Sequence, residues 1–250
     1  MRDLGAPPIA TVRTRTLFVP LDGGRAETVA QRLIDAIALG LLLDGERLPT
    51  ETDLAGQLGV SIGTLRDGLA TLRTLGLVET RRGRGGGSFV RAPREQHRAR
   101  LELPLRHRSL HELRDIGDHR GAIAGAAARL AAERALDGEL ETMREHLERL
   151  RGAGTLTDRR RADARIHIEI AAAAQSPRLV REEMELWSAV GDLIWLPVGE
   201  ADAAAVIAEH EPLIAAIAAR EPEHARARAE RHVAAETERL IELRLALGEP

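Results

Sequence analysis

The amino-acid sequence predicts a mostly α-helical protein in two parts: three helices with a small β-hairpin, followed by an all-α bundle of six helices. Three observations predict this class. Apolar residues recur at helical spacing through most of residues 110–247. Residues 27–75 hold three shorter helical segments, and short apolar runs flank the glycine-rich stretch 81–87. The charge also divides, with 12 arginines against 10 acidic residues in 1–91 and 19 against 27 in 109–250.

Composition excludes several classes of protein. With 250 residues and 44% hydrophobic content, the chain can bury a core, so disorder does not describe the whole chain. It has no cysteine, so any metal must be bound by nitrogen and oxygen. No apolar run approaches the roughly 20 residues that span a bilayer, and the N-terminus lacks the apolar core of a signal peptide. We therefore expect a cytoplasmic protein with no membrane partner.

The N-terminal elements follow from periodicity and capping residues. Residues 1–24 contain three prolines and are expected to form an N-terminal arm. A first helix is expected over 27–39. A second helix is expected over 51–58, with Thr50 as its N-cap and Gly59 at its end.

A third helix is expected to begin after Ser61, a good N-cap. Gly68 lies inside this helix, where glycine is about 1 kcal/mol less favourable than alanine. The sequence alone gives no reason for a glycine here. The stretches "GLVET" and "SFV" then predict two strands joined by a turn of glycine and arginine. Together these elements predict a winged helix-turn-helix over 25–91.

Such a unit suits double-stranded DNA, because the second helix of the motif enters the major groove with its N-terminal residues at the base edges. Ser61, Thr64 and Arg66 occupy that position, and Arg66 is suited to a bidentate guanine contact worth roughly 1–3 kcal/mol. Arg82 and Arg84, with Arg81 beside them, lie where a wing meets phosphates or the minor groove. The alternative is a three-helix module that binds protein and carries an ordinary solvated charge run.

The rest of the chain predicts a linker and the bundle. Residues 92–108 are charged, contain two prolines and are expected to link the two domains. The bundle domain is expected over 109–250. Its six helices are expected near 110–135, 137–152, 156–175, 177–196, 201–219 and 222–246.

Four residues of the bundle suggest a metal site. Asp163 and His167 are four residues apart, so they share one helix face. His210 and His232 lie on the apolar faces of their own segments and are expected to point inward. One aspartate with three histidines and no sulfur suits a divalent transition metal such as Zn, Ni or Mn, with room for a small carboxylate ligand. The alternatives are a chance D-x-x-x-H pattern and buried histidines that fill the core.

The N-terminal motifs resemble the GntR family of bacterial transcription regulators. The quoted stretch "GERLPTETDLAGQLGVSIGTLRDGLATLRTLGLVETRRGRGGGSFV" carries the resemblance. It implies DNA contacts by Ser61, Gly63, Thr64, Arg66 and the wing glycines near Gly85. Relatives often have arginine where this chain has Thr52 and Ile62, so Thr52 is a DNA-facing position with altered chemistry, and the operator is expected to differ from the common one.

The segments "DARIHIEIAAAAQSPRLV", "AEHEPLIAAIAA" and "AERHVAAE" resemble the FCD effector-binding domain of the FadR subfamily, and six helices favour its VanR-like branch. The resemblance implies that Asp163, His167, His210 and His232 bind a metal. Arg120 matches an arginine that could anchor an effector carboxylate, and an ion pair with Asp118 or a neighbouring helix is the alternative. Pro212 lies two residues after His210 and would break a mid-helix hydrogen bond unless a helix starts or kinks there.

These resemblances imply a homodimeric regulator, usually a repressor, that binds an inverted-repeat operator and responds to a small organic acid at the metal. We expect no enzymatic activity and no catalytic residues. Two alternatives stay open. One is a metal-dependent enzyme of the bundle domain fused to a nucleic-acid-binding module. The other is a regulator without metal, in which the four residues fill polar space and Arg120 alone binds the ligand.

Overall fold

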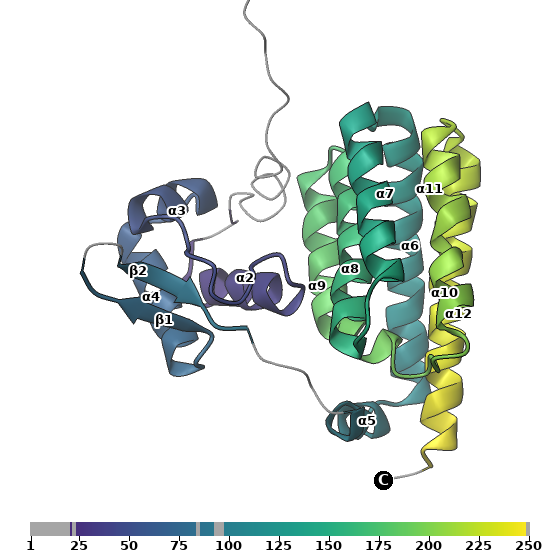
Figure 1. Ribbon diagram of the computed structural model, residues 1–250, viewed down its shortest axis with the longest axis horizontal. Helices are drawn as coiled ribbons and strands as arrows, with labels where there is room; N and C mark the ends of the chain where they lie inside the picture. The colour runs from purple at the N-terminus through teal and green to yellow at the C-terminus, as the bar shows by residue number, and fades with distance from the viewer. Residues whose placement is uncertain (1–20, 22–23, 84–85, 93–97, 249–250) are drawn as a thin grey trace, which may run out of the picture. The chain divides into compact units, whose positions relative to one another are not determined.

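The computed structural model describes residues 21, 24–83, 86–92 and 98–248. Its contacts divide the chain into two compact units, Met1–Pro93 and Arg94–Pro250. Both are built mainly from helices, and a single hairpin lies in the first (Figure 1). Each unit is described by itself below.

The first unit contains the three expected helices and the expected hairpin. The elements are α2 Ala26–Ala38, α3 Glu51–Leu58, α4 Ile62–Thr74, β1 Val78–Arg81 and β2 Gly87–Val90. The capping predictions are confirmed: Oγ1 of Thr50 accepts from the amide of Asp53 at 3.2 Å, and Oγ of Ser61 accepts from the amide of Thr64 at 3.0 Å. Gly59 ends α3 with φ of 67°, a left-handed conformation that glycine adopts without strain.

The two strands pair antiparallel, with Val78 opposite Val90 and Arg81 opposite Gly87. Arg47 adds an isolated antiparallel bridge to Phe89, which ties the turn after α2 to the hairpin. The predicted wing residues Arg84 and Gly85 lie outside the described residues, as does most of the expected N-terminal arm.

Gly68 has a structural role that the sequence alone did not reveal. A Cβ at this position would lie 2.8 Å from Cγ1 of Val29 and 3.1 Å from the carbonyl oxygen of Ala26. Val29 is fully buried, so it has little freedom to move away. Glycine therefore allows α4 to pack closely against α2, and that packing accounts for a residue of poor helix propensity.

The second unit is a helical bundle. Its helices are α5 Arg98–Arg106, α6 Leu110–Arg134, α7 Asp137–Arg151, α8 Leu156–Ala173, α9 Pro177–Ile194, α10 Ala203–Ala208, α11 His210–Ala218 and α12 Pro222–Ala246. α6 packs along α12, and Figure 1 shows the two side by side. α8 packs against α6, α7 and α9, so it is buried on almost every side. None of the helices in the described part of the chain combines the length and apolar character that crossing a membrane requires.

The structure differs from expectation inside the segment 92–108. Residues 98–106 form α5, and the division between the two units falls before it. Leu105 is fully buried in a cluster with Leu113, Leu193 and Leu240. Because this side chain has a core to enter, the segment is helical and belongs to the bundle.

The expected helix over 201–219 is two helices, α10 and α11, which meet at Glu209. Pro212 explains the break, because it has no amide hydrogen and would leave a gap in a continuous helix. In the first turn of α11 no such hydrogen bond is needed. Seven helices therefore follow residue 109 in the described chain. The expected count of six was wrong, and with it the reason for favouring the VanR-like branch.

Candidate functional site

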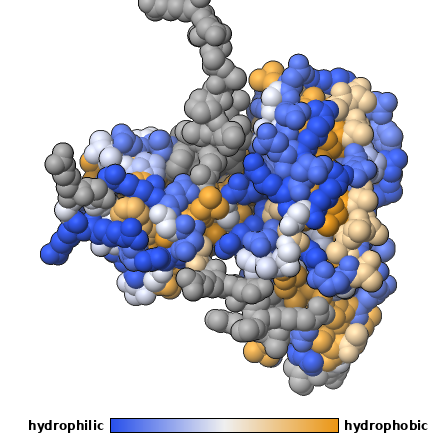
Figure 2. All heavy atoms as spheres, in the orientation of Figure 1, coloured by the Kyte–Doolittle hydropathy of each residue, from blue (hydrophilic) through white to orange (hydrophobic). Residues whose placement is uncertain are grey.

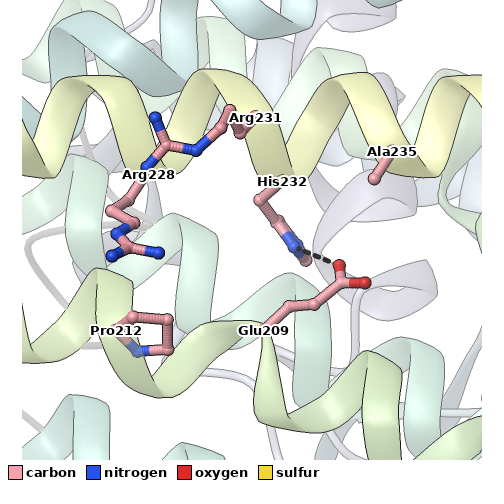
Figure 3. Close-up of a pocket in the computed structure, with 6 residues that line it drawn as sticks. All are labelled: Glu209, Pro212, Arg228, Arg231, His232 and Ala235. Atoms are coloured by element: carbon pink, nitrogen blue, oxygen red, sulfur yellow. Dashed lines mark hydrogen bonds and ion pairs between the residues drawn. The ribbon is translucent and has the colours of Figure 1, made fainter.

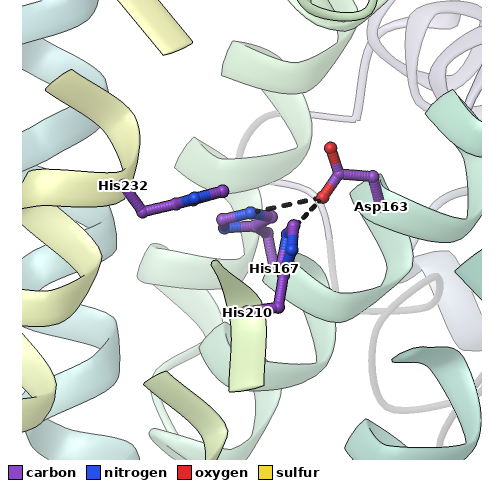
Figure 4. A group of neighbouring side chains, drawn as sticks. All are labelled: Asp163, His167, His210 and His232. Atoms are coloured by element: carbon purple, nitrogen blue, oxygen red, sulfur yellow. Dashed lines mark hydrogen bonds and ion pairs between the residues drawn. The ribbon is translucent and has the colours of Figure 1, made fainter. Parts of the chain in front are cut away.

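Four polar side chains meet inside the bundle. Asp163 and His167 come from α8, His210 from the first residue of α11, and His232 from the middle of α12. One candidate ligand atom from each lies within 4.8 Å of the others. Figure 4 shows the imidazoles of His167 and His210 next to the Asp163 carboxylate, with the His232 ring beyond that of His167. All four side chains are almost fully buried, which is unusual for so many polar groups in one place.

Local geometry explains how the four residues converge. Asp163 and His167 lie one helical turn apart on α8, a largely buried helix. The break at Glu209 places His210 at the start of α11, where its Nε2 lies 2.8 Å from Oδ1 of Asp163. The helix start that Pro212 requires is therefore present: α11 begins at His210, Pro212 lies in its first turn, and His210 is fully buried.

Hydrogen bonds of the Nδ1 atoms fix which ring nitrogen of His210 and of His232 points into the cluster. Nδ1 of His210 lies 3.1 Å from the carbonyl oxygen of Ile207, and Nδ1 of His232 lies 3.0 Å from Oε2 of Glu209. Both partners are acceptors only, so each Nδ1 carries the proton that forms the hydrogen bond. The Nε2 atoms are thereby directed toward the other members of the cluster, as in histidine ligands of metals.

Two ring nitrogens of the cluster have no hydrogen-bond partner among the described residues. Nε2 of His167 and Nε2 of His232 are buried without one among the described residues. Nε2 of His232 is 3.4 Å from Oε1 of Glu236, but this geometry makes no hydrogen bond. Unsatisfied buried polar atoms are costly, so the arrangement favours a ligand between them. Three imidazole nitrogens and one carboxylate oxygen match the donor set of a divalent transition metal.

Asp163 is held in place from the opposite side. Its Oδ2 accepts a hydrogen bond from Nε1 of Trp195 at 2.8 Å, which leaves Oδ1 facing His210 and His167. Burial opposes the charged form of Asp163, but the two imidazoles outweigh burial and hold its pKa well below the ordinary value. The carboxylate is therefore ionised, as a metal ligand must be.

The pKa values of two of the histidines shift in opposite directions. Burial and the neighbouring His232 lower the pKa of His210. Burial works against a proton on His232 too, but Glu236 and Glu209 overcome it and raise the pKa of His232 to about 10. A metal bound at Nε2 of His232 must therefore displace a proton.

Arg120 is engaged inside the bundle. Its Nη2 donates to Oε2 of Glu236 at 2.9 Å, and its guanidinium carbon lies 5.2 Å from the centre of the Trp187 ring. Arg120 and His232 lower the pKa of Glu236 to about 2 against the effect of burial. The sequence offered an effector carboxylate or an ion pair as its partner, and the structure places it in an ion pair with a neighbouring helix.

Several residues around the cluster escaped the sequence analysis. Trp195, Glu183 and Glu236 each contact or approach a candidate ligand, with Oε1 of Glu183 3.9 Å from Nδ1 of His167. Glu236 lies four residues after His232, a spacing that could have revealed it.

Glu169 is buried beside Glu139 of α7, and burial with that neighbour raises its pKa to about 8.

A hollow on the bundle surface reaches the cluster. Figure 3 shows Arg228, Arg231 and His232 on α12, with Glu209 and Pro212 across from them. The lining residues are Glu209, Pro212, Arg228, Arg231, His232 and Ala235.

The expected DNA contacts of the first unit lie at its surface. Thr52, Ser61, Gly63, Arg66 and Arg82 are exposed, and Thr64 is half-buried. Nε of Arg66 donates to Oε2 of Glu51 at 2.6 Å, so the arginine is held at the start of α3 by an exposed ion pair. Figure 2 shows hydrophilic side chains over the visible face around the hairpin.

Known proteins share both units of this chain. Residues 25–87 match the family described as bacterial regulatory proteins, gntR family, and residues 115–235 match the FCD domain. A protein of Mycobacterium gastri named as the HTH-type transcriptional regulator RmpR is 42% identical over 227 residues, which are 90% of this chain and 83% of that protein. The Glc operon transcriptional activator of Escherichia coli strain K12 is 31% identical over 62% of each chain. The solved structure of E. coli McbR/YncC aligns with 91% of this chain and 97% of its own, at 21% identity and a TM-score of 0.49.

Proposed function

Because this chain belongs to the GntR family of bacterial transcriptional regulators with an FCD domain, we propose that it is a homodimeric repressor controlled by a small organic acid at a metal centre. Each protomer presents one winged helix to half of an inverted-repeat operator, since two-fold protein symmetry calls for two-fold DNA. Ser61, the N-cap of α4, and Gly63, Thr64 and Arg66 at the start of α4 read the major groove, and Thr52, Arg82, Arg84 and Gly85 contact the backbone or minor groove.

One observation carries the metal centre. The ligand atoms of Asp163, His167, His210 and His232 lie within 4.8 Å of one another, and two of the nitrogens are buried without a partner. These four side chains would bind the ion, which we take to be Zn, Ni or Mn. When bound, such an ion supplies an electron-pair acceptor for a carboxylate oxygen. Because a carboxylate oxygen can bind such an ion directly, the effector class that we propose is a small carboxylate.

Effector control requires a difference between two states. The acid changes DNA affinity only if it binds one arrangement of the protein better than the other. Arg120 supports the site through Glu236, since its guanidinium is already paired there. We therefore assign effector binding first to the metal centre and only secondly to Arg120.

Metal analysis tests the proposal directly. Protein purified without chelator or histidine tag should contain about one equivalent of transition metal, and His167→Ala and His232→Ala should lose it. His224→Ala is the matched control, because His224 is exposed on the same helix as His232 and contacts Glu221. No metal in the wild type, with all proteins folded, would remove the metal centre from the proposal and leave the DNA-binding part.

Further measurements complete the test. The mass in solution should be that of a dimer, and DNA selected from a random pool should contain an inverted repeat. A thermal-shift screen of organic acids should give stabilisation only with metal present. A reporter assay decides the sign of regulation, because repression rests on the family resemblance and one relative is named an activator. Turnover of a screened acid would favour the alternative of a metal-dependent enzyme.

A further inference from the structure

Glu209 links the candidate metal centre to the bundle surface. Its Oε2 accepts a hydrogen bond from Nδ1 of His232 at 3.0 Å, drawn as the dashed line in Figure 3. Its two oxygens also accept from the guanidinium of Arg239, at 2.9 and 3.3 Å. The carboxylate is therefore held on both sides, by a fork of two donors and by the imidazole.

We propose that Glu209 is a positioning residue of the metal centre, which keeps the Nδ1 proton of His232 and turns Nε2 toward the other ligands. The proposal rests on the metal proposed above. A neutral imidazole can carry its proton on either nitrogen, and only the form protonated at Nδ1 leaves Nε2 free to bind a metal. A carboxylate on Nδ1 selects that form, fixes the ring plane and strengthens the ligand.

The position of Glu209 in the chain gives it a second connection to the site. It joins α10 to α11, and the next residue is the ligand His210. Nδ1 of His210 is bonded to the carbonyl oxygen of Ile207, two residues before Glu209. One short junction therefore supplies the acceptors that orient two of the three imidazoles, so a movement of the junction would redirect both.

Glu209 is also accessible from outside. About a third of its side chain is exposed, whereas only 2% of His232 is. Glu209 and His232 line the same hollow as Arg228 and Arg231. Arg239 lies on the same helix as His232, seven residues later, and its fork keeps the carboxylate turned toward the imidazole.

Variants of Glu209 test the assignment on the full chain. We expect Glu209→Ala to bind Zn or Co 10- to 100-fold more weakly than the wild type, measured by competition with a chromophoric chelator. Glu209→Gln should lose less affinity, because its amide oxygen still accepts from Nδ1. Glu211→Gln is the matched control: Glu211 is exposed and lies two residues further on, and its carboxylate pairs with Arg151 and forms no hydrogen bond or ion pair with the four candidate ligands in the described part of the chain.

The absorption spectrum of the cobalt-loaded proteins gives a second readout. A displaced imidazole should change the visible bands of Co in Glu209→Ala and partly restore them in Glu209→Gln, whereas a general loss of stability would leave the bands of the folded protein unchanged. Equal affinity and equal spectra in wild type and Glu209→Ala would overturn the proposal, and so would an equal loss in Glu211→Gln. If Glu209→Ala does not fold, the affinity and spectrum of Glu209→Gln decide. A wild type without metal affinity would instead remove the metal centre itself.

Discussion

Arg120 and Glu236 form an ion pair inside the bundle, with Nη2 of the arginine 2.9 Å from Oε2 of the glutamate and no more than 5% of either side chain exposed. The pair connects α6 to α12, and the other oxygen of Glu236 approaches Nε2 of His232. Arg120 therefore supports the helix that carries a candidate metal ligand.

Removing this arginine should destabilise the bundle. We expect Arg120→Gln to lower the free energy of unfolding by up to about 3–5 kcal/mol, because Glu236 loses its guanidinium partner in the interior and keeps only the His232 imidazole, 3.4 Å away, beside it. The double variant with Glu236→Gln should recover most of the loss. Urea unfolding followed by tryptophan fluorescence measures it, since both tryptophans, Trp187 and Trp195, lie in the bundle unit. An unchanged stability would mean that Arg120 is free to serve an effector.

Two arginines of the DNA-binding unit should behave differently. Arg66→Ala should cost about 1–3 kcal/mol of discrimination at one base pair, because a bidentate contact to guanine is lost. Arg82→Ala should weaken binding to all sequences alike and reduce the salt dependence by about one counterion. Titrations of the selected operator and its single-base variants at several salt concentrations distinguish the two. Arg226→Ala, in an exposed ion pair of the bundle, is the control and should change neither.

His146 predicts a loss of stability in acid. Burial, with the charges of Arg165 and Arg149, lowers its pKa from 6.5 to about 4. As the pH falls below 6.5, the unfolded chain binds a proton that the folded chain does not accept until about pH 4, so stability is lost between these values. The loss is up to about 3 kcal/mol. His146→Gln should remove this part of the pH dependence, whereas His224→Gln, at an exposed position, should not. Urea unfolding at pH 7, 6 and 5 measures the difference.

Gly68→Ala should destabilise the first unit even though alanine favours helices. The gain of about 1 kcal/mol in propensity is smaller than the roughly 1–3 kcal/mol that overpacking costs against the buried Val29. Val29→Ala should make the alanine at 68 tolerable, so the double variant loses less than the two single effects combined. Gly56→Ala is the control, because a Cβ there meets nothing within 4 Å and should stabilise α3. Thermal unfolding followed by calorimetry measures all four proteins, and an increased stability of Gly68→Ala would contradict the packing argument.

The local features of this protein were predictable from its sequence. Thr50 and Ser61 cap the helices that they were expected to cap, and β1 and β2 form the expected hairpin. These features depend on residues a few positions apart, whose geometry is the same in any fold. The pairing of Asp163 and His167 on one helix face was predictable in the same way, since the helix alone sets their spacing.

The long-range contacts depended on the tertiary structure. Asp163 and His210 meet although 47 residues separate them, and Arg120 finds Glu236 across 116 residues. The unforeseen helix α5 and the close approach behind Gly68 likewise follow from how the helices pack. The sequence by itself determined where most of the helices form and which chemistry they carry, because propensity, capping and periodicity act within a few residues. Only the packing of the bundle decided which partner each polar side chain meets, because that choice depends on helices distant in the chain and on the burial that their contacts create.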